Sequence, residues 1–239
     1  INTTRERRFE ANTRLDNHGS ETTGEYRLYA DININNPIGI GDKLNIGVLG
    51  SFNPENAVYG AARYSLPLYY PQTLFTLGYS SNDFVTDDSK SLGSGFQVTG
   101  ESQVTDINFL YKFVRSRANN QNFSLGYAQI NSTIDFGGVQ NSAIEKQVNR
   151  LDIAYTFDVL NEKARVLHQG SLTYSYGDFV KGAEEGQEIN PNIIGIDYSR
   201  LSFIRLPLMT SDSKLILRVM AQYAGSPLTE VLQFGLAGP

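Results

Sequence analysis

Apolar and polar residues alternate along most of the chain with a period of two. Between residues 26 and 35 the apolar positions are Tyr26, Leu28, Ala30, Ile32 and Ile34. The positions between them are Arg27, Tyr29, Asp31, Asn33 and Asn35. A period of two places one kind of side chain on each side of a β-strand. The alternation returns in segments 44–53, 106–113, 150–159 and 214–223, and it predicts strands with one apolar and one polar face.

The alternating segments are separated by clusters of Gly, Asn, Asp and Pro, which are typical of turns and loops. Together they predict eleven strands, near residues 7–16, 24–36, 43–53, 56–68, 72–84, 96–115, 121–134, 147–160, 165–179, 193–208 and 213–224. Several of these segments reach ten residues or more, which is close to the length that a tilted strand needs to cross a bilayer. The sequence therefore predicts an all-β fold, specifically a transmembrane antiparallel β-barrel.

The predicted connections fall into two classes by length. The short ones are "NPIGIGD", "PENA" and "NEK", and the long, polar ones are "DDSKSLGSG", "DFGGVQNSAIEK" and "VKGAEEGQEINPN". Bacterial outer-membrane barrels have short turns at the periplasmic end and longer loops at the extracellular end. We therefore expect the two classes of connection at opposite ends of the barrel.

A large soluble β-sandwich or β-solenoid is the main alternative, since its strands also alternate. Its polar face would contact solvent and would be richer in Lys and Glu. Here the polar positions are mainly Asn, Ser, Thr, Gln and Gly, with Arg and Asp between them. The apolar runs end in aromatic residues such as Tyr26, Phe52, Tyr111, Phe113 and Tyr174. Because aromatic residues gather at both interfaces of membrane barrels, this distribution favours the barrel.

Composition agrees with a folded β-protein and excludes several functions. The 239 residues include 14 Tyr, 13 Phe and 22 Gly but no Trp, a balance that favours strands and tight turns. The formal charge of -5 gives no reason to expect a nucleic-acid partner. With no cysteine there is no disulfide, no thiolate nucleophile and no Cys-based metal site. No stretch has the roughly 18 apolar residues of a spanning helix, so a membrane protein with this sequence must be a barrel.

Candidate catalytic and metal-binding motifs are incomplete. "GSETTGEY" has the glycine spacing of a phosphate loop, but Glu25 and Tyr26 follow where Lys and Ser or Thr are needed. His18 and His168 lie far apart, and neither has a metal-binding spacing around it. No serine lies in G-x-S-x-G. We therefore expect no enzyme activity, no cofactor and no metal site, with a lipid-modifying barrel enzyme as a distant alternative.

Several separated motifs carry a resemblance to a known family. The stretch "LDNHGSETTGEYRLYADININNPIGIGDKL" contains D-N-x-G, T-G-x-Y-R and N-P-x-G-x-G-D in order. The matching residues are Asp16, Asn17, Gly19, Thr23, Gly24, Tyr26, Arg27, Asn36, Pro37, Gly39, Gly41 and Asp42. This is similar to the first hairpin of the two-partner-secretion transporters (TpsB type), the haemolysin secretion/activation family. "YGAARYSLPLYYPQTLFTLGYSSNDF" and "GSGFQVTGES" extend the resemblance, which covers essentially the whole chain.

The end of the chain resembles the approach to that family's V-R-G-Y or V-R-G-F loop, through Phe234, Gly235, Gly238 and Pro239. The family's barrel is similar to one of about sixteen strands. Residues 1–239 are therefore expected to form the N-terminal two thirds of an outer-membrane barrel domain. The resemblance implies POTRA domains before this segment and the final strands after it.

The resemblance also implies a location in the bacterial outer membrane and a function in translocation. The passenger would be a secreted partner (TpsA-type) protein such as a haemolysin, adhesin or toxin, passed in extended form without ATP. Outer-membrane lipid and lipopolysaccharide would be the other partners of a monomeric barrel. A BamA-like outer-membrane protein assembly factor and a diffusive porin remain alternatives.

Charged residues at the polar positions are the candidates for lining such a passage. They are Arg27, Asp31, Arg63, Asp106, Lys112, Arg150, Asp152 and Arg218. Mixed charge with Asn and Ser would keep a lumen hydrated and let an extended chain slide without being held at one site. The alternative is that these residues merely satisfy one another. The first strand is less apolar than its neighbours, which suits either a seam that opens laterally or an ordinary polar edge.

Overall fold

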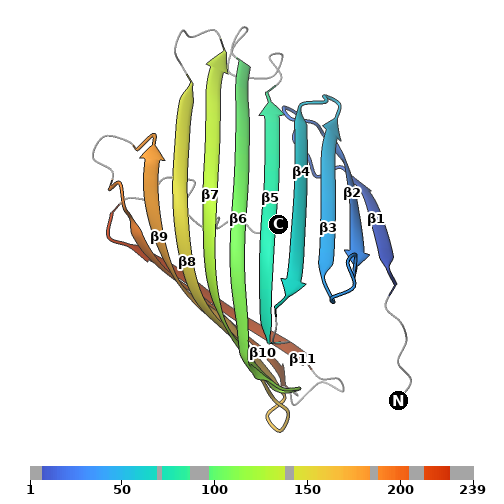
Figure 1. The fold of residues 1–239 in the computed structure, drawn as a ribbon, viewed down its shortest axis with the longest axis vertical. Helices are drawn as coiled ribbons and strands as arrows, with labels where there is room; N and C mark the ends of the chain where they lie inside the picture. Colours follow the sequence, from blue (N-terminus) through green and yellow to red (C-terminus); the bar gives the residue numbers. More distant parts are fainter. Residues whose placement is uncertain are drawn as a thin grey trace. The chain divides into compact units, whose positions relative to one another are not determined.

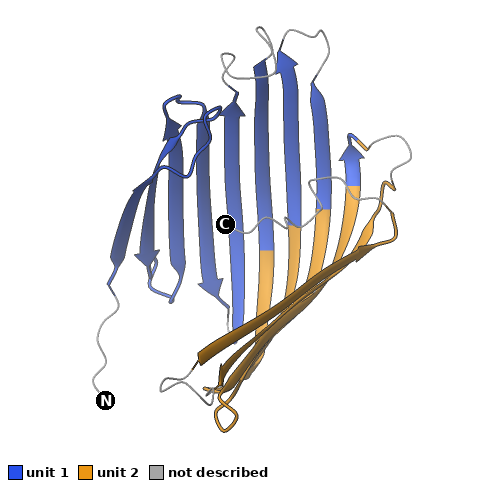
Figure 2. Cartoon of the chain, turned by 180° about the vertical axis from the view of Figure 1, so that it is seen from behind, with its two compact units in different colours: residues 1–107, 128–149, 179–182 blue, residues 108–127, 150–178, 183–239 orange. Residues whose placement is uncertain are grey.

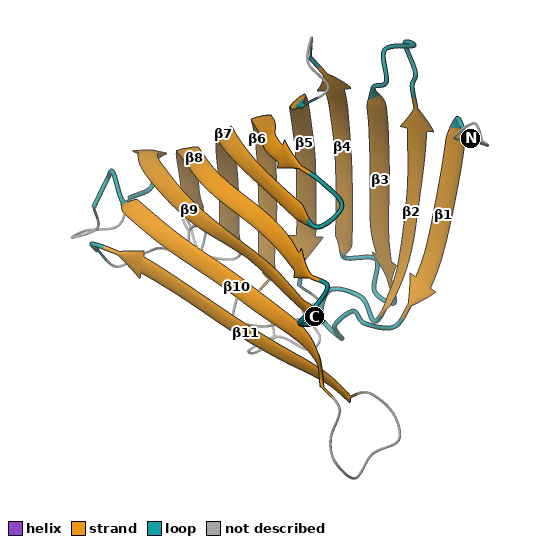
Figure 3. Cartoon of the chain, turned by 90° about the horizontal axis from the view of Figure 1, so that it is seen from below, coloured by secondary structure: helices purple, strands orange, loops and turns teal. Residues whose placement is uncertain are grey.

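The chain folds as a single antiparallel sheet in the computed structural model, which describes residues 7–68, 72–86, 97–137, 143–183, 188–204 and 213–226. The described residues form eleven strands: β1 (Phe9–Asp16), β2 (Tyr26–Asn35), β3 (Lys43–Phe52), β4 (Ala57–Pro67), β5 (Thr73–Val85), β6 (Gln97–Arg115), β7 (Asn119–Gly137), β8 (Ile144–Asn161), β9 (Val166–Lys181), β10 (Asn192–Ile204) and β11 (Ser213–Ala224). Each strand pairs with the next one in sequence (Figure 1). The described residues contain strands and loops but no helix, and hence none that could span a membrane (Figure 3). The predicted all-β fold and its eleven strands are confirmed.

Strand bounds differ most from the prediction at β7, which extends to Gly137 instead of residue 134, and at β8, which begins at Ile144 instead of residue 147. The prediction began β7 at residue 121, whereas the strand begins at Asn119. Ser116 makes the turn tight: its backbone N–H donates to the Asn119 carbonyl at 2.9 Å, and its hydroxyl accepts from the Asn119 N–H at 2.8 Å. Pairing therefore resumes two residues early. The strand predicted over 193–208 ends as β10 at Ile204, and residues 205–208 lie outside the described part.

One grouping of the connections was wrong. "PENA" was placed with "NPIGIGD", but β3 pairs antiparallel with both β2 and β4, so these two connections lie at opposite ends of β3. Short length alone does not decide the end, because any hairpin with compact turn residues can close tightly. We name one end of the strands the short-turn end. In β2–β5 it is the end with the β2–β3 and β4–β5 connections. In β6–β9 it is the end with the β6–β7 and β8–β9 connections.

Two compact units divide the chain, and the boundary passes through β6 to β9 (Figure 2). Unit 1 holds residues 1–107, 128–149 and 179–182, and unit 2 holds residues 108–127, 150–178 and 183–239. Within unit 1 the pairing from β1 to β5 runs residue for residue, with Leu15 opposite Leu28 and Ile32 opposite Ile46. Within unit 2, β9 to β11 pair in the same uninterrupted way. The alternation of each strand is therefore carried to its neighbour.

The apolar face of each unit is exposed rather than packed against a second layer. Leu28 is 50% exposed, Val48 53%, Leu172 50% and Val219 50%. Only a few apolar side chains among the described residues are buried, for example Val148 and Phe179. A continuous apolar surface of this kind is what a lipid-facing sheet presents.

The threonine and glycine of the T-G-x-Y-R motif attach the β1–β2 connection to the β3–β4 turn. The Ser51 hydroxyl donates to the Thr23 carbonyl at 2.5 Å and accepts from the Ala57 N–H at 2.8 Å. Gly24 has φ of 121°, and a Cβ there would lie 2.5 Å from the Ser51 Cβ. Glycine is thus required twice, by the backbone conformation and by the close approach of Ser51.

Asp42 organises the β2–β3 turn, which is the N-P-x-G-x-G-D motif. Its side chain is fully buried, and its Oδ2 accepts from the Tyr64 hydroxyl at 2.7 Å and from the Ile38 N–H at 3.4 Å. Burial acts to raise the pKa of Asp42, but hydrogen bonds from Tyr64 and from backbone N–H groups in the turn lower it by more. The pKa of Asp42 therefore lies below its ordinary value of 3.8.

Replacing Asp42 tests this turn. Since the pKa of Asp42 is lower in the folded than in the unfolded protein, its carboxylate adds stability that is present above pH 3.8 and is lost as the pH falls below that value. We expect Asp42→Asn to lower the melting temperature of the full-length protein by a few degrees at pH 7, with the gap to wild type narrowing below about pH 4. Heat-induced band shifts in gels, after incubation at each pH, measure this gap.

Tyr64→Phe is the matched control, because it removes one donor and keeps the carboxylate. It should lower the melting temperature by less than Asp42→Asn does at pH 7. A gap between wild type and Asp42→Asn that stays constant from pH 7 to about pH 3 would contradict the role given to the carboxylate.

Candidate functional site

The eight charged residues predicted to line a passage lie on the polar sides of their strands. Arg27, Arg63 and Arg218 are opposite Ser51, Gly78 and Ser199, respectively. On β11 this side also carries two exposed apolar residues, Ile216 and Met220. The others alternate with apolar neighbours on β2, β6 and β8: they are Asp31, Asp106, Lys112, Arg150 and Asp152. We describe the polar face of each unit separately.

In unit 1, Asp16 joins β1 to β2. Its Oδ1 accepts from the Arg27 Nε at 2.8 Å, and its Oδ2 accepts from the Arg14 Nε at 3.1 Å. The side chain of Asp16 is only 9% exposed, against 29% for Arg27. The sequence placed Asp16 in the first-hairpin motif but did not identify it as the counter-ion of Arg27.

A network of amide side chains surrounds Asp31 on the same face. The Asp31 Oδ2 accepts from Asn12 Nδ2 at 3.2 Å and from Asn33 Nδ2 at 2.9 Å. Asn33 in turn accepts from Asn45 Nδ2 at 2.9 Å. These contacts connect β1, β2 and β3 without any aliphatic side chain, so this part of the face is strongly hydrophilic.

Arg63 and Asp106 pair across an intervening strand. The Arg63 Nη2 lies 3.3 Å from the Asp106 Oδ1, although Arg63 is on β4 and Asp106 on β6. Gly78 of β5 is opposite Arg63, and a Cβ there would lie 2.2 Å from the Asp106 Oδ1. The ion pair therefore occupies the space that any other residue at position 78 would fill.

Unit 2 repeats the arrangement with different residues. Arg150 Nε donates to Asp152 Oδ2 at 2.9 Å, and the Ser175 hydroxyl donates to the other oxygen of Asp152 at 2.5 Å. Arg218 binds Asp197 through two hydrogen bonds, Nε to Oδ1 at 3.2 Å and Nη2 to Oδ2 at 2.8 Å. Two donors of one guanidinium on one carboxylate form the stronger, bidentate geometry.

Asp197 was not predicted, although it falls on the polar positions of "NIIGIDYSRL" and the alternation contained the signal.

Lys112 differs from the other cations, because it makes no ion pair with the described residues. It lines a hollow of about 430 Å³ together with Asn120, Asn122, Thr156 and Asp158.

The charges of the polar face are thus paired along the sheet, either within one strand or between strands close together. Exposed pairs of this kind contribute little to folding stability, since water screens them. Their main effect is on the charge that the polar face presents, because most of the predicted cations are already paired with a carboxylate. Two of these pairs, Arg63 with Asp106 and Arg150 with Asp152, join predicted residues to one another. Arg27 and Arg218 pair instead with carboxylates outside the predicted set.

The first-hairpin motif residues lie mostly in connections and at strand ends. Tyr26 stacks on Phe52 with ring centroids 5.7 Å apart, and the Asn36 Oδ1 accepts from the Gly41 N–H at 2.6 Å. Phe234, Gly235, Gly238 and Pro239 lie outside the described residues. Within the described part, no group of three or more His, Cys, Asp and Glu side chains comes together as a metal site would require.

Comparison with known proteins gives one family and several similar solved chains. Residues 1–239 match the family model described as "Haemolysin secretion/activation protein ShlB/FhaC/HecB". CdiB from Escherichia coli is 18% identical, with a TM-score of 0.82 over 99% of this chain and 44% of its own. CdiB from Acinetobacter baumannii is also 18% identical, with a TM-score of 0.73 over 93% of this chain and 40% of its own. No curated protein matches in sequence.

The chain therefore spans less than half the length of the solved structures that it matches. At this identity they show the fold, which is the predicted outer-membrane β-barrel fold, and the family match adds the class of protein. The chain belongs to the ShlB/FhaC/HecB family of haemolysin secretion/activation proteins, the TpsB-type transporters of the bacterial outer membrane.

Proposed function

We propose that the polar face of this chain lines the route by which a secreted partner protein leaves the cell. The observation that carries the proposal is the pairing of Arg27, Arg63, Arg150 and Arg218 with carboxylates on the same face. The partner would be a TpsA-type protein, such as a haemolysin, adhesin or toxin, that crosses in extended form without ATP.

A paired surface suits an extended passenger for a physical reason. An unfolded chain exposes backbone N–H and C=O groups that must stay hydrated, and a wall of Asn, Ser and ion pairs keeps water in place. Apart from Lys112, the predicted cations that a passing charged side chain meets already have counter-ions, so they do not bind it strongly. Conduction requires binding that is weak enough for the chain to leave.

The proposal extends to the rest of the polypeptide. We propose that residues 1–239 form the N-terminal two thirds of a monomeric barrel domain, with POTRA domains before it and the final strands after it. The match to less than half of each CdiB chain supports a longer protein. The family is one of transporters, and we propose that the barrel contacts lipid and lipopolysaccharide and catalyses no reaction.

Site-specific crosslinking tests the passenger route directly. Residues 1–239 contain no cysteine, so introduced thiols are unique within this segment. The passenger is the secreted protein encoded beside the full-length transporter, stalled by a stably folded domain at its C-terminus and carrying one cysteine. We expect Asn45→Cys on the polar face to form a disulfide with the stalled passenger, detected by a mobility shift in non-reducing gels.

Val48→Cys on the apolar face of the same strand is the matched control and should not crosslink. Crosslinks at Val48→Cys, or at neither position in a complex shown to be stalled, would overturn the proposal. Loss of other outer-membrane barrels from cells that lack the protein would favour an assembly factor. Uptake of small solutes with secretion unchanged would favour a porin.

Charge pairing gives a second, kinetic prediction. Asp106→Asn leaves Arg63 without its counter-ion, so a passing carboxylate would bind there and release would slow. We expect about two- to fivefold slower appearance of the passenger in the medium after a pulse label, a size typical of one exposed ion pair.

The double variant Arg63→Gln with Asp106→Asn removes both charges and should recover most of the wild-type rate. A double variant as slow as Asp106→Asn alone would contradict the charge argument and point to a structural defect. Heat-induced band shifts of each variant show independently whether the barrel has folded.

A further inference from the structure

A group of polar side chains interrupts the apolar face of unit 2. Arg200 of β10 lies opposite His168 of β9 and Leu217 of β11. Its neighbours along β11 on this face are exposed aliphatic residues, with Leu215 53%, Leu217 52% and Val219 50% exposed. We call His168, Tyr198, Arg200 and Ser202 the Arg200 cluster, because all four lie on the apolar side of β9 or β10.

The side chain of Arg200 is directed toward the short-turn end. Its Nε donates to the hydroxyl of Ser202 at 3.0 Å. Ser202 is opposite Val166, the first residue of β9 after the β8–β9 connection, so it lies nearer the short-turn end than Arg200 does. Arg200 itself is exposed, and it makes no ion pair with the described residues. A long cationic side chain in an apolar surface bends toward the nearest polar layer in this way.

His168 and Tyr198 complete the cluster. The His168 Nδ1 lies 2.7 Å from the Tyr198 hydroxyl, and the two rings stack with centroids 6.1 Å apart. When the tyrosine hydroxyl donates to Nδ1, the neutral imidazole carries its proton on Nε2, which becomes a further donor. The cluster thus offers a guanidinium and an imidazole from directly opposed residues.

The surroundings match the depth of a membrane interface. On the same face, Tyr155 stacks with Phe113 at 6.1 Å and with Phe157 at 5.9 Å between ring centroids. The ring of Phe157 packs against Gly170, which is opposite Tyr198. Aromatic residues grouped like this mark the level at which lipid headgroups begin.

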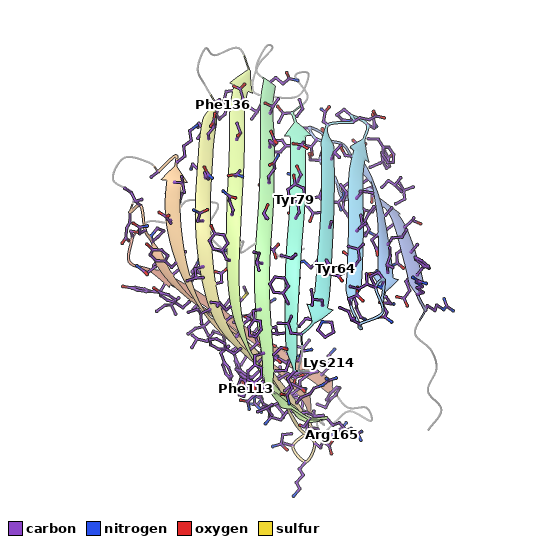
Figure 4. The ribbon with its side chains drawn as sticks, in the orientation of Figure 1. Tyr64, Tyr79, Phe113, Phe136, Arg165 and Lys214 are labelled. Carbon is purple, nitrogen blue, oxygen red and sulfur yellow. The ribbon has the colours of Figure 1, made fainter. Side chains whose placement is uncertain are left out.

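The adjoining connections are basic. The β6–β7 and β8–β9 connections carry Arg117, Lys163 and Arg165, with Glu162 as the acidic residue between them. A hydrogen bond from Leu160 N–H to the Ala118 carbonyl joins the end of β8 to the β6–β7 connection, and one from Phe203 N–H to the Arg165 carbonyl joins the β8–β9 connection to β10. Arg165 lies beyond Phe113 at this end of the sheet (Figure 4).

We propose that the Arg200 cluster binds the phosphate of an anionic phospholipid in the inner leaflet of the outer membrane. A cation on a lipid-facing surface is costly without a counter-ion, and the protein supplies none among the described residues. The guanidinium can donate hydrogen bonds to two phosphate oxygens, and His168 Nε2 can donate to the same phosphate. Leu215 and Leu217 would contact the acyl chains. The inner leaflet is assigned because short turns are periplasmic.

This inference goes beyond passenger transport and does not depend on it. The test uses the purified full-length protein in detergent micelles, with native mass spectrometry to follow titrated dioleoyl-phosphatidylglycerol. We expect wild type to bind it in preference to dioleoyl-phosphatidylcholine. Arg200→Gln should weaken phosphatidylglycerol binding about tenfold, and Arg200→Lys should weaken it less, because it keeps the charge but loses the two-pronged geometry.

Arg117→Gln is the matched control, since it removes the same charge at the same end but outside the cluster, and it should leave binding unchanged. Equal losses in Arg117→Gln and Arg200→Gln would overturn the proposal in favour of diffuse attraction. Preference for lipid A over phosphatidylglycerol would overturn the assignment to the inner leaflet. If Arg200→Gln fails to fold, equal binding of the two phospholipids by wild type would still refute the site.

Discussion

The residue-for-residue pairing of neighbouring strands is the constraint on which the rest of the structure depends. A slip of one residue would exchange the two faces of a strand, because side chains alternate with a period of two. The register that sets Leu28 opposite Leu15 also sets Arg27 opposite Asp16. The apolar surface and the ion pairs are therefore two results of one alignment. The ion pairs are partly open to water and therefore weak, so they follow from the register more than they enforce it.

The connections fix that register at the strand ends. Asp42 ties the β2–β3 turn to Tyr64 of β4, and Ser51 ties the β1–β2 connection to the start of β4 through Thr23 and Ala57. The motif residues in these connections therefore act mainly by fixing the register of the strands. Register is the property on which the residue types of a turn have their strongest effect.

The strands were predictable because the alternation persists through almost all of them, including "NIIGIDYSRL", where the polar positions include Asp197. The start of β7 was not, since Asn119 and Asn120 have the composition of a loop and only the tight turn at Ser116 shows otherwise. The contact between Arg63 and Asp106 was beyond sequence analysis. It joins residues 43 positions apart across an intervening strand, and it requires the absence of a side chain at Gly78.

The two faces neutralise their cations in different ways, and this difference indicates that the polar face is in contact with water and the apolar face with hydrocarbon. On the polar face Arg218 binds Asp197 through two hydrogen bonds, while Lys112 makes no ion pair with the described residues and lines a hollow with amide and hydroxyl side chains and Asp158. Both arrangements are stable where water is present, because water solvates any charge that has no partner in the protein. On the apolar face the one partner of Arg200 among the described residues is a serine hydroxyl. Hydrocarbon cannot complete its solvation, so its counter-ion must come from the polar layer toward which it is directed.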